Sequence, residues 1–144
     1  GDGVKRKSLE LLASRLGISD RISFVGSVYQ KDVVRYQSVA DIFISMNDIS
    51  SLSNVVFEAM SCGRCVIALD RGTTRELIKD GENGIVINSF EELKDTIIKL
   101  LSDTSLVTRL GAEAKKTIDT WPSWEERVQQ EIKLINSLCE NNTH

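Results

Sequence analysis

Short apolar segments of strand length alternate along this chain with segments in which apolar residues recur at helical spacing. The strand-like segments span residues 22–26, 41–46, 65–69 and 84–87. The helix-like segments lie around residues 9–16, 31–39, 54–62, 73–79, 90–102, 105–119 and 124–139,. Parallel strands need a crossover between them, usually a helix, so this alternation favours a parallel sheet. The predicted fold class is α/β, with helices covering both faces of the sheet.

The size and charge of the chain narrow the possible functions. Its 144 residues suffice for one domain of ordinary size but not for two, so the predicted domain spans residues 1–144,. A net charge of −3 argues against binding of nucleic acid,. The sequence shows neither a secretory leader nor an apolar run long enough to span a membrane, and its three cysteines are an odd number,. We therefore expect a cytoplasmic protein with reduced cysteines.

One predicted helix start differs from the others in how its backbone amides can be satisfied. The helices at 73–79, 90–102 and 124–139 begin with the capping-box pattern, a Ser or Thr followed three residues later by Glu,. The helix at 54–62 has no such carboxylate, although Ser53 or Asn54 can cap it. It follows a serine-rich loop after a strand, and its free amides and dipole favour a phosphate or sugar ligand there. A solvated helix end is the alternative.

Glu58 lies one turn into the same helix. Val56, Ala59 and Met60 recur at the spacing of a stripe that faces the core, whereas Glu58 belongs to another face,. A carboxylate at that place can accept hydrogen bonds from ligand hydroxyls near the helix start. A solvated polar face is the plainer interpretation.

Cys62 and Cys65 form a Cys-x-x-Cys pattern. Redox chemistry with this pattern needs the first cysteine at a helix N-terminus, where the dipole lowers its pKa. Here the pair follows a helix and enters a strand, so we interpret both cysteines as core-lining residues. A zinc site would also need the distant Cys139 and His144, and we therefore predict no metal site,.

Several short motifs, taken together, point to a known family. They are Gly1-Asp2-Gly3, residues 21–26, Asn54, Glu58-Ala59-Met60, Gly63, Glu76, Asp80-Gly81 and Asn83-Gly84. Their order and spacing resemble the C-terminal, donor-binding domain of the retaining group 1 glycosyltransferases, which have two Rossmann-like domains (the GT-B type). The resemblance covers nearly the whole chain. It implies a Rossmann-like sheet whose first strand lies before Gly1.

The resemblance also implies a donor site for a nucleoside-diphosphate sugar, with no metal and no further cofactor. The family's helix start after the serine-rich loop holds the diphosphate and sugar with backbone amides. The corresponding residues are Ser51, Leu52, Ser53, Asn54 and Val55. Glu58 corresponds to the glutamate that binds the donor ribose. Gly1 and Gly3 form the family's glycine turn, and Gly26-Ser27-Val28 would lie against the nucleobase.

One position departs from the family's pattern of two glutamates separated by seven residues (EX7E). Counting back from Glu58, the first glutamate is replaced by Ser50. A serine can hydrogen-bond a sugar hydroxyl but carries no charge, and Asp48 is the candidate substitute,. The predicted catalytic residues are therefore Glu58, Ser50 and Asp48.

Two functions follow from this sequence. The first is the donor-binding half of a hexosyltransferase, inactive on its own. Its acceptor, a glycan or lipid, would bind a missing N-terminal domain, and the full-length protein would associate peripherally with a membrane. The second is a catalytically silent α/β module that binds a nucleotide or a partner. A receiver-type signalling domain is disfavoured, because its clustered acids after the first strand and its lysine after the last are missing.

Overall fold

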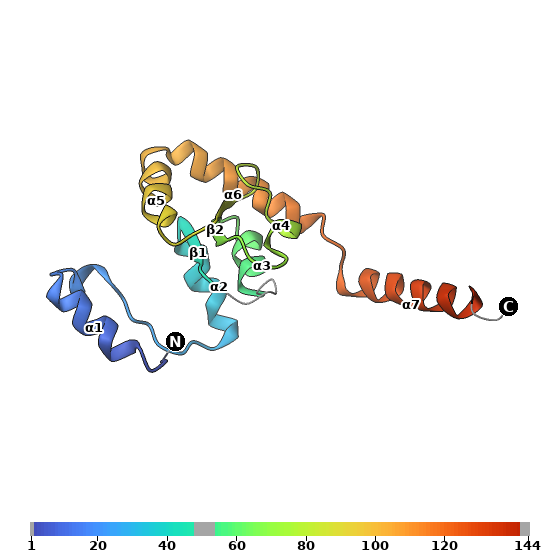
Figure 1. Cartoon of the computed structure of the whole chain (residues 1–144), viewed down its shortest axis with the longest axis horizontal. Coiled ribbons are helices and arrows are strands. Elements are labelled where there is room, and N and C mark those ends of the chain that lie inside the picture. Colours follow the sequence, from blue (N-terminus) through green and yellow to red (C-terminus); the bar gives the residue numbers. More distant parts are fainter. Residues whose placement is uncertain (1, 48–53, 142–144) are drawn as a thin grey trace. The chain divides into compact units, whose positions relative to one another are not determined.

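The structure is a computed structural model that describes residues 2–47 and 54–141, with side chains as far as residue 139. The chain divides into two compact units, residues 1–40 and residues 41–144. Figure 1 labels most of the elements of both units. The extent of the predicted domain stays a prediction.

The first unit consists of three helical elements. They are α1 (Arg6–Arg15), the 3₁₀ turn η1 (Ser19–Arg21) and α2 (Gln30–Val39). Gly17 follows the end of α1, with φ +67°, and its amide donates to the carbonyl of Ser14. The Ile18 amide donates to the carbonyl of Ala13, which completes a Schellman motif at the end of α1,.

Residues 22–26 do not form the predicted strand. An extended segment becomes a strand only when its backbone pairs with a neighbour, and no strand within the described residues pairs with this one,. Its carbonyl at Phe24 accepts instead from the side chain of Arg6, at 2.8 Å. Ile22 and Phe24 line an apolar pocket of about 240 Å³ beside α1.

The second unit contains the sheet. Its elements are β1 (Ile42–Ser45), α3 (Asn54–Ser61), β2 (Cys65–Leu69), α4 (Thr74–Leu77), β3 (Ile85–Ile87), α5 (Glu92–Ser102), α6 (Thr104–Asp119) and α7 (Trp124–Asn141). The described strands are parallel, in the order β1-β2-β3. Ile42 is in register with Cys65, and Ile67 is in register with Ile85. The predicted strands at 41–46, 65–69 and 84–87 are therefore confirmed.

Helices cover both faces of the central strand, β2, which is buried along its whole length. Val66 and Ala68 join the core with residues of α3, α4 and the second half of α6. Cys65, Ile67 and Leu69 join a second core with residues of α5 and the first half of α6. A run of apolar residues without polar alternation is what a strand buried on two faces requires. The predicted α/β fold class is confirmed.

The strand β1 lies at an edge of the described sheet and is less buried than its sequence predicts. Ile44 is 41% exposed, and the other three residues of β1 are half-buried. The apolar run at 41–46 predicts a buried strand, but such a run does not show whether the strand has neighbours on both sides, and among the described residues β1 pairs on one side only,.

Two glycines allow α3 and α6 to approach each other closely. Gly63 ends α3 with φ +67°, and Gly111 is buried in α6. A Cβ atom added to Gly111 would overlap the carbonyl oxygen of Gly63 and lie 3.1 Å from its carbonyl carbon. Phe57 of α3 and Trp121 pack edge-to-face nearby, with ring centroids 5.6 Å apart,.

A buried asparagine organises the turn between α4 and β3. The Asn83 side chain is 3% exposed, and its Oδ1 atom accepts from the amide of Lys79 at 2.8 Å. Its Nδ2 atom donates to the carbonyl of Leu77 and to the hydroxyl of Thr117 on α6, each at 3.0 Å. The turn at residues 80–84 is therefore anchored to α6.

Of the three predicted capping boxes, only the last is present as predicted. Ser123 and Glu126 satisfy each other's amides, with N···O distances of 2.8 Å and 3.1 Å. The prediction at Thr73 is wrong, because that side chain does not cap α4. The prediction at residue 89 is also wrong. There α5 begins two residues later than predicted, and the Glu92 carboxylate accepts from the amide of Asn88.

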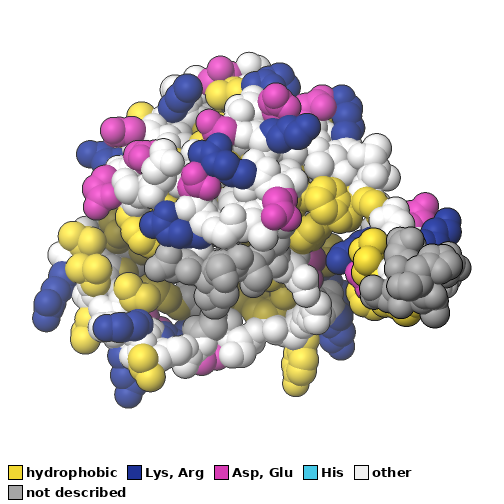
Figure 2. Space-filling view, turned by 45° about the vertical axis from the view of Figure 1, so that its right-hand side comes forward, with side chains coloured by type: hydrophobic (Ala, Val, Ile, Leu, Met, Phe, Trp, Pro, Cys, Tyr) yellow, Lys and Arg dark blue, Asp and Glu magenta, His cyan; other side chains and the backbone are white. Residues whose placement is uncertain are grey.

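The surface carries charges of both signs and many apolar side chains. Around α6, in the upper part of the view in Figure 2, Lys and Arg side chains lie among Asp and Glu side chains. This mixing gives no large patch of one sign on that face. Apolar side chains also remain exposed on α7, among them Trp124 at 70%. None of the described helices is long and apolar enough to cross a membrane.

Candidate functional site

The start of α3 lies at the carboxyl edge of the sheet. Strands β1 and β2 are parallel, and α3 is the crossover between them. A crossover helix runs back against the strand direction, so its N-terminus lies where β1 ends. Asn54 and Val55 are the first residues of α3, and both are exposed at this edge.

Several predicted site residues lie outside the described residues. They are Gly1, Asp48, Ser50, Ser51, Leu52 and Ser53. Their predicted roles therefore stay predictions.

Glu58 stands on α3 between the core stripe and the exposed face. Val56, Ala59 and Met60 are buried, which confirms the predicted core stripe. Glu58 is half-buried, and its Oε2 atom is buried. The Glu58 side chain is partly exposed and lies one turn from the helix start. Its carboxylate can therefore accept hydrogen bonds from a ligand at that start.

Two arginines follow β2 at the same edge of the sheet, and the analysis of the sequence missed them. The Arg75 Nε atom lies 2.9 Å from Asp70 Oδ2, so the carboxylate of Asp70 balances the positive charge of Arg75. The Arg71 side chain donates to the carbonyl of Asp70 at 2.6 Å. The position of Asp70 and Arg71 directly after an apolar strand was the available signal, because in a parallel sheet such residues lie at the ligand-binding edge.

The predicted nucleobase turn lies in the first unit, and its shape requires glycine. Gly26 has φ +82°, in the left-handed region that residues with a Cβ rarely adopt,. A Cβ atom at this position would lie 3.0 Å from Arg6 Nη1 and from Asp2 Oδ1. The turn is therefore packed directly against these two charged side chains.

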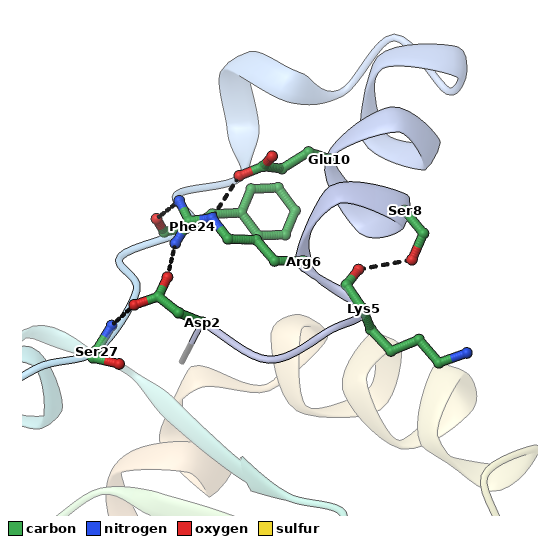
Figure 3. A network of polar contacts seen from close by, with 7 residues as sticks. All are labelled: Asp2, Lys5, Arg6, Ser8, Glu10, Phe24 and Ser27. Carbon is green, nitrogen blue, oxygen red and sulfur yellow. Dashed lines mark hydrogen bonds and ion pairs between the residues drawn. The ribbon is translucent and has the colours of Figure 1, made fainter.

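Asp2 and Arg6 contact the backbone of the turn after and before Gly26, respectively (Figure 3). The Asp2 Oδ2 atom accepts from the amide of Ser27 at 2.7 Å, and its Oδ1 atom accepts from Arg6 Nη1 at 2.6 Å. Arg6 also donates from Nη2 to the carbonyl of Phe24 and from Nε to Glu10, each at 2.8 Å. The Ser27 amide, together with Arg6, holds the pKa of Asp2 below its ordinary value,.

The roles of Asp2 and Arg6 were not predicted, although Asp2 belongs to the Gly1-Asp2-Gly3 motif. The signal was the repeated spacing of four residues between opposite charges, from Asp2 to Arg6 and from Arg6 to Glu10, of which only the second pair lies within α1,. The bond to Ser27, 25 residues away, leaves no trace in local spacing. Gly3 lies beside these residues, and its carbonyl accepts from the amide of Arg6.

A cavity of about 540 Å³ opens beside the turn in the first unit. Its lining residues are Val25, Ser27, Val28, Tyr29, Asp32, Arg35, Tyr36 and Val39. Small-molecule sites commonly measure about 300–1,000 Å³ and combine apolar and aromatic walls with a few polar groups. Ser27 and Val28, two of the residues predicted to lie against the nucleobase, thus form part of the wall of a cavity of suitable size.

The cysteines do not have the arrangement of a redox pair. Cys65 is buried in β2 and Cys62 is half-buried, and none of the three cysteines, all within the described residues, forms a disulfide. Burial raises the pKa of the Cys65 thiol to about 11, opposite to the shift that a redox-active cysteine needs,. The interpretation of Cys65 as a core residue is confirmed.

Alkylation of the folded protein by iodoacetamide at about pH 8 should follow the exposure of these thiols. We expect Cys139 to react first, Cys62 more slowly, and Cys65 only after unfolding, because its thiol is both buried and protonated. Mass spectrometry of the peptides measures the order, and the protein in denaturant, where all three should react, is the control. Equal rates for Cys65 and Cys139 in the folded protein would contradict the buried position of β2.

Comparison with known proteins places the chain in a family. The family model "Glycosyl transferases group 1" matches residues 1–117. The lipopolysaccharide core biosynthesis glycosyltransferase LpsE of Rhizobium meliloti is 31% identical over 139 residues, which cover 95% of this chain and 40% of the relative. The alpha-D-kanosaminyltransferase of Streptomyces kanamyceticus is 30% identical over 116 residues, which cover 79% of this chain and 30% of the relative. The chain thus spans well under half the length of these relatives.

Solved structures agree with this match. A sucrose-phosphate synthase from Thermosynechococcus elongatus is 25% identical, with a TM-score of 0.81 over 99% of this chain and 36% of the other. The Anabaena protein HepE, solved in complex with UDP and glucose, is also 25% identical, with a TM-score of 0.78 over 91% of this chain and 36% of the other. The predicted resemblance is confirmed: this chain belongs to the group 1 glycosyltransferases.

Proposed function

We propose that this chain is the donor-binding half of a glycosyltransferase that moves a hexosyl group from a nucleoside-diphosphate sugar to an acceptor. The observation that carries the proposal is the crossover helix α3, which starts at the carboxyl edge of a parallel sheet and presents Glu58 one turn later. Helix N-termini favour anions, and the leaving diphosphate of such a donor is an anion. Backbone amides can therefore stabilise the charge that develops on it.

We assign the parts of the donor to residues of each unit. In the second unit, the backbone of residues 51–55 would hold the diphosphate and the sugar, and Glu58 would accept from the ribose hydroxyls. Ser50 would hydrogen-bond the sugar, with Asp48 as a substitute for the missing carboxylate. In the first unit, the turn Gly26-Ser27-Val28 would contact the nucleobase, and Gly1 and Gly3 would border the donor.

The remaining parts of the proposal concern the whole protein. The acceptor, a glycan or a lipid, would bind a part of the protein that this chain does not include. We propose a cytoplasmic enzyme that needs neither a metal nor a further cofactor and that associates with a membrane at its surface. HepE in complex with UDP and glucose supports a uridine diphosphate sugar as one candidate donor.

A second candidate is a module that binds a nucleotide without chemistry. The observation that favours it is Ser50, which stands where the family's first glutamate is expected. A neutral hydroxyl cannot form the stronger, charge-assisted hydrogen bond to the sugar.

Calorimetric titration of the chain with UDP, GDP and ADP tests the donor site. We expect at least one of them to bind with one-to-one stoichiometry and a Kd on the order of 10–1,000 µM, within the usual range of substrate affinities. The matching nucleoside monophosphate should bind more weakly, because it makes fewer contacts to the start of α3. The proposal fails if none of the three diphosphates binds.

A further inference from the structure

The contacts of Asp2 are unusual for a side chain so close to the solvent. Its side chain is 52% exposed, yet both carboxylate oxygens have protein partners, Ser27 N and Arg6 Nη1. Exposed ion pairs contribute little to stability, so the pair with Arg6 is a poor explanation for this arrangement. The distinctive feature is the second partner, the backbone amide of a residue 25 positions later.

Arg6 contacts the same turn, and we call Asp2 and Arg6 together the clamp. Its guanidinium donates in three directions, to Asp2, to Glu10 and to the carbonyl of Phe24. The clamp thus holds one backbone carbonyl before Gly26 and one backbone amide after it. A planar guanidinium with several donors is suited to fixing two groups in one geometry, which the point charge of a lysine is not.

The clamped turn is also the wall of the cavity in the first unit. Ser27 and Val28 line the cavity of about 540 Å³, and the neighbouring Gly26 packs against Asp2 and Arg6, which are not among the lining residues. Any movement of the Ser27 amide away from Asp2 would therefore change the shape of the cavity wall. Figure 3 shows Asp2 and Arg6 reaching the turn from the start of α1.

We infer that Asp2 and Arg6 are positioning residues for nucleobase recognition: Asp2, oriented by Arg6, holds the Gly26-Ser27-Val28 turn in the shape that distinguishes one base from another. This inference rests on the proposed donor site. Neither side chain needs to touch the donor. A group that acts through a turn affects the part of the ligand that meets this turn, so its loss should alter the choice of base more than the binding of the phosphates.

Titrations of the Asp2→Ala and Arg6→Gln variants with UDP, GDP and ADP test the inference. The readout is the ratio of the Kd values of the best and second-best nucleotides. We expect this ratio to fall by about threefold to tenfold in both variants, the effect of losing one well-placed hydrogen bond. Glu10→Gln is the matched control, because Glu10 also contacts Arg6 but does not reach the turn. Its ratio should stay at the wild-type value.

A merely structural role gives a different result. If Asp2→Ala lowers the melting temperature and weakens the binding of all three nucleotides by the same factor, the inference is wrong. The ¹H–¹⁵N spectrum adds a direct readout. The Ser27 amide proton should lie downfield in the wild type and move upfield in Asp2→Ala and in Asp2→Asn, which keeps the shape of the side chain but not its charge. An unchanged Ser27 signal, or unfolding of both variants, overturns the inference.

The same titrations separate this inference from the proposed function. A wild-type chain that binds no nucleotide overturns both. A wild-type chain that binds all three nucleotides equally well, or variants that keep the wild-type ratio, overturn only the inference and leave the donor site in place.

Discussion

Replacement of Gly111 by alanine should destabilise the protein by about 3 kcal/mol, at the upper end of what overpacking a core usually costs. On helix propensity alone, the same change would stabilise α6 by about 1 kcal/mol. The contact with α3 reverses the sign, because the new Cβ would overlap the carbonyl oxygen of Gly63. That oxygen belongs to the backbone, so no side-chain rotation can relieve the overlap. To remove the overlap, α6 must move away from α3 and β2. These three elements together form much of the core.

Urea denaturation followed by circular dichroism measures this effect. Ala112→Gly is the matched control: Ala112 is the next residue of α6 and is exposed, so its replacement should cost only the propensity difference of about 1 kcal/mol,. The two variants thus exchange the same pair of residues in opposite directions at neighbouring positions. A Gly111→Ala variant more stable than the wild type would show that α6 is not held against Gly63.

The elements that the sequence predicts well are those determined by local periodicity. The core stripe of α3 follows from the spacing of Val56, Ala59 and Met60, and all three are buried. The uninterrupted apolar run of β2 predicts burial on two faces, which the two cores on either side of it confirm. In both cases, the pattern records directly which side of the element meets the core.

The predictions that fail depend on partners that local patterns do not record. Residues 22–26 have the composition of a strand but lack a neighbouring strand among the described residues. The Thr73 box fails although Thr73 directly precedes α4, because its backbone, at φ −93° and ψ 12°, lacks the extended conformation of a capping residue,. The clamp on Gly26 joins residues far apart in the chain, so no window of sequence contains it.

The same distinction applies to the proposed donor site. The start of α3 and the position of Glu58 could be predicted, because a missing capping carboxylate and a helical stripe are both local features. For the arginines after β2 and the contacts of Asp2 and Arg6, the sequence offers a position after a strand and a spacing of four, but neither signal identifies the contact partners that the structure shows.

Glu58→Gln should weaken binding of the nucleoside diphosphate about fivefold to 150-fold, equivalent to about 1–3 kcal/mol for the loss of a charge-assisted hydrogen bond. Glutamine keeps the size of the side chain and one acceptor oxygen, so the change removes the charge rather than the shape. The fold should survive, because the core side of α3 is formed by Val56, Ala59 and Met60. Calorimetry with wild type and variant measures the affinity, and thermal denaturation measures the stability.

Glu113→Gln is the matched control for this experiment. Glu113 is also a half-buried glutamate on a helix of the second unit, but it pairs with Lys116 on α6 and has no place in the proposed donor site. It should bind the nucleotide as the wild type does. If Glu58→Gln instead keeps full affinity and loses stability, Glu58 is a structural residue.

A comparison of two ligands tests the consequence of Ser50. In the family's pattern two carboxylates share the recognition of the donor, whereas here Ser50 leaves Glu58 as the only glutamate of the pair. If no other acid substitutes, Asp48→Asn should bind both the sugar nucleotide and the nucleoside diphosphate as the wild type does. If Asp48 substitutes, Asp48→Asn should weaken binding of the sugar nucleotide but not of the nucleoside diphosphate, whereas Glu58→Gln should weaken binding of both. Titrating both variants with both ligands distinguishes these cases, because Glu58 is assigned to the ribose and Asp48 to the sugar. Equal affinities of the wild type and both variants for both ligands would remove α3 and its preceding loop from the donor site.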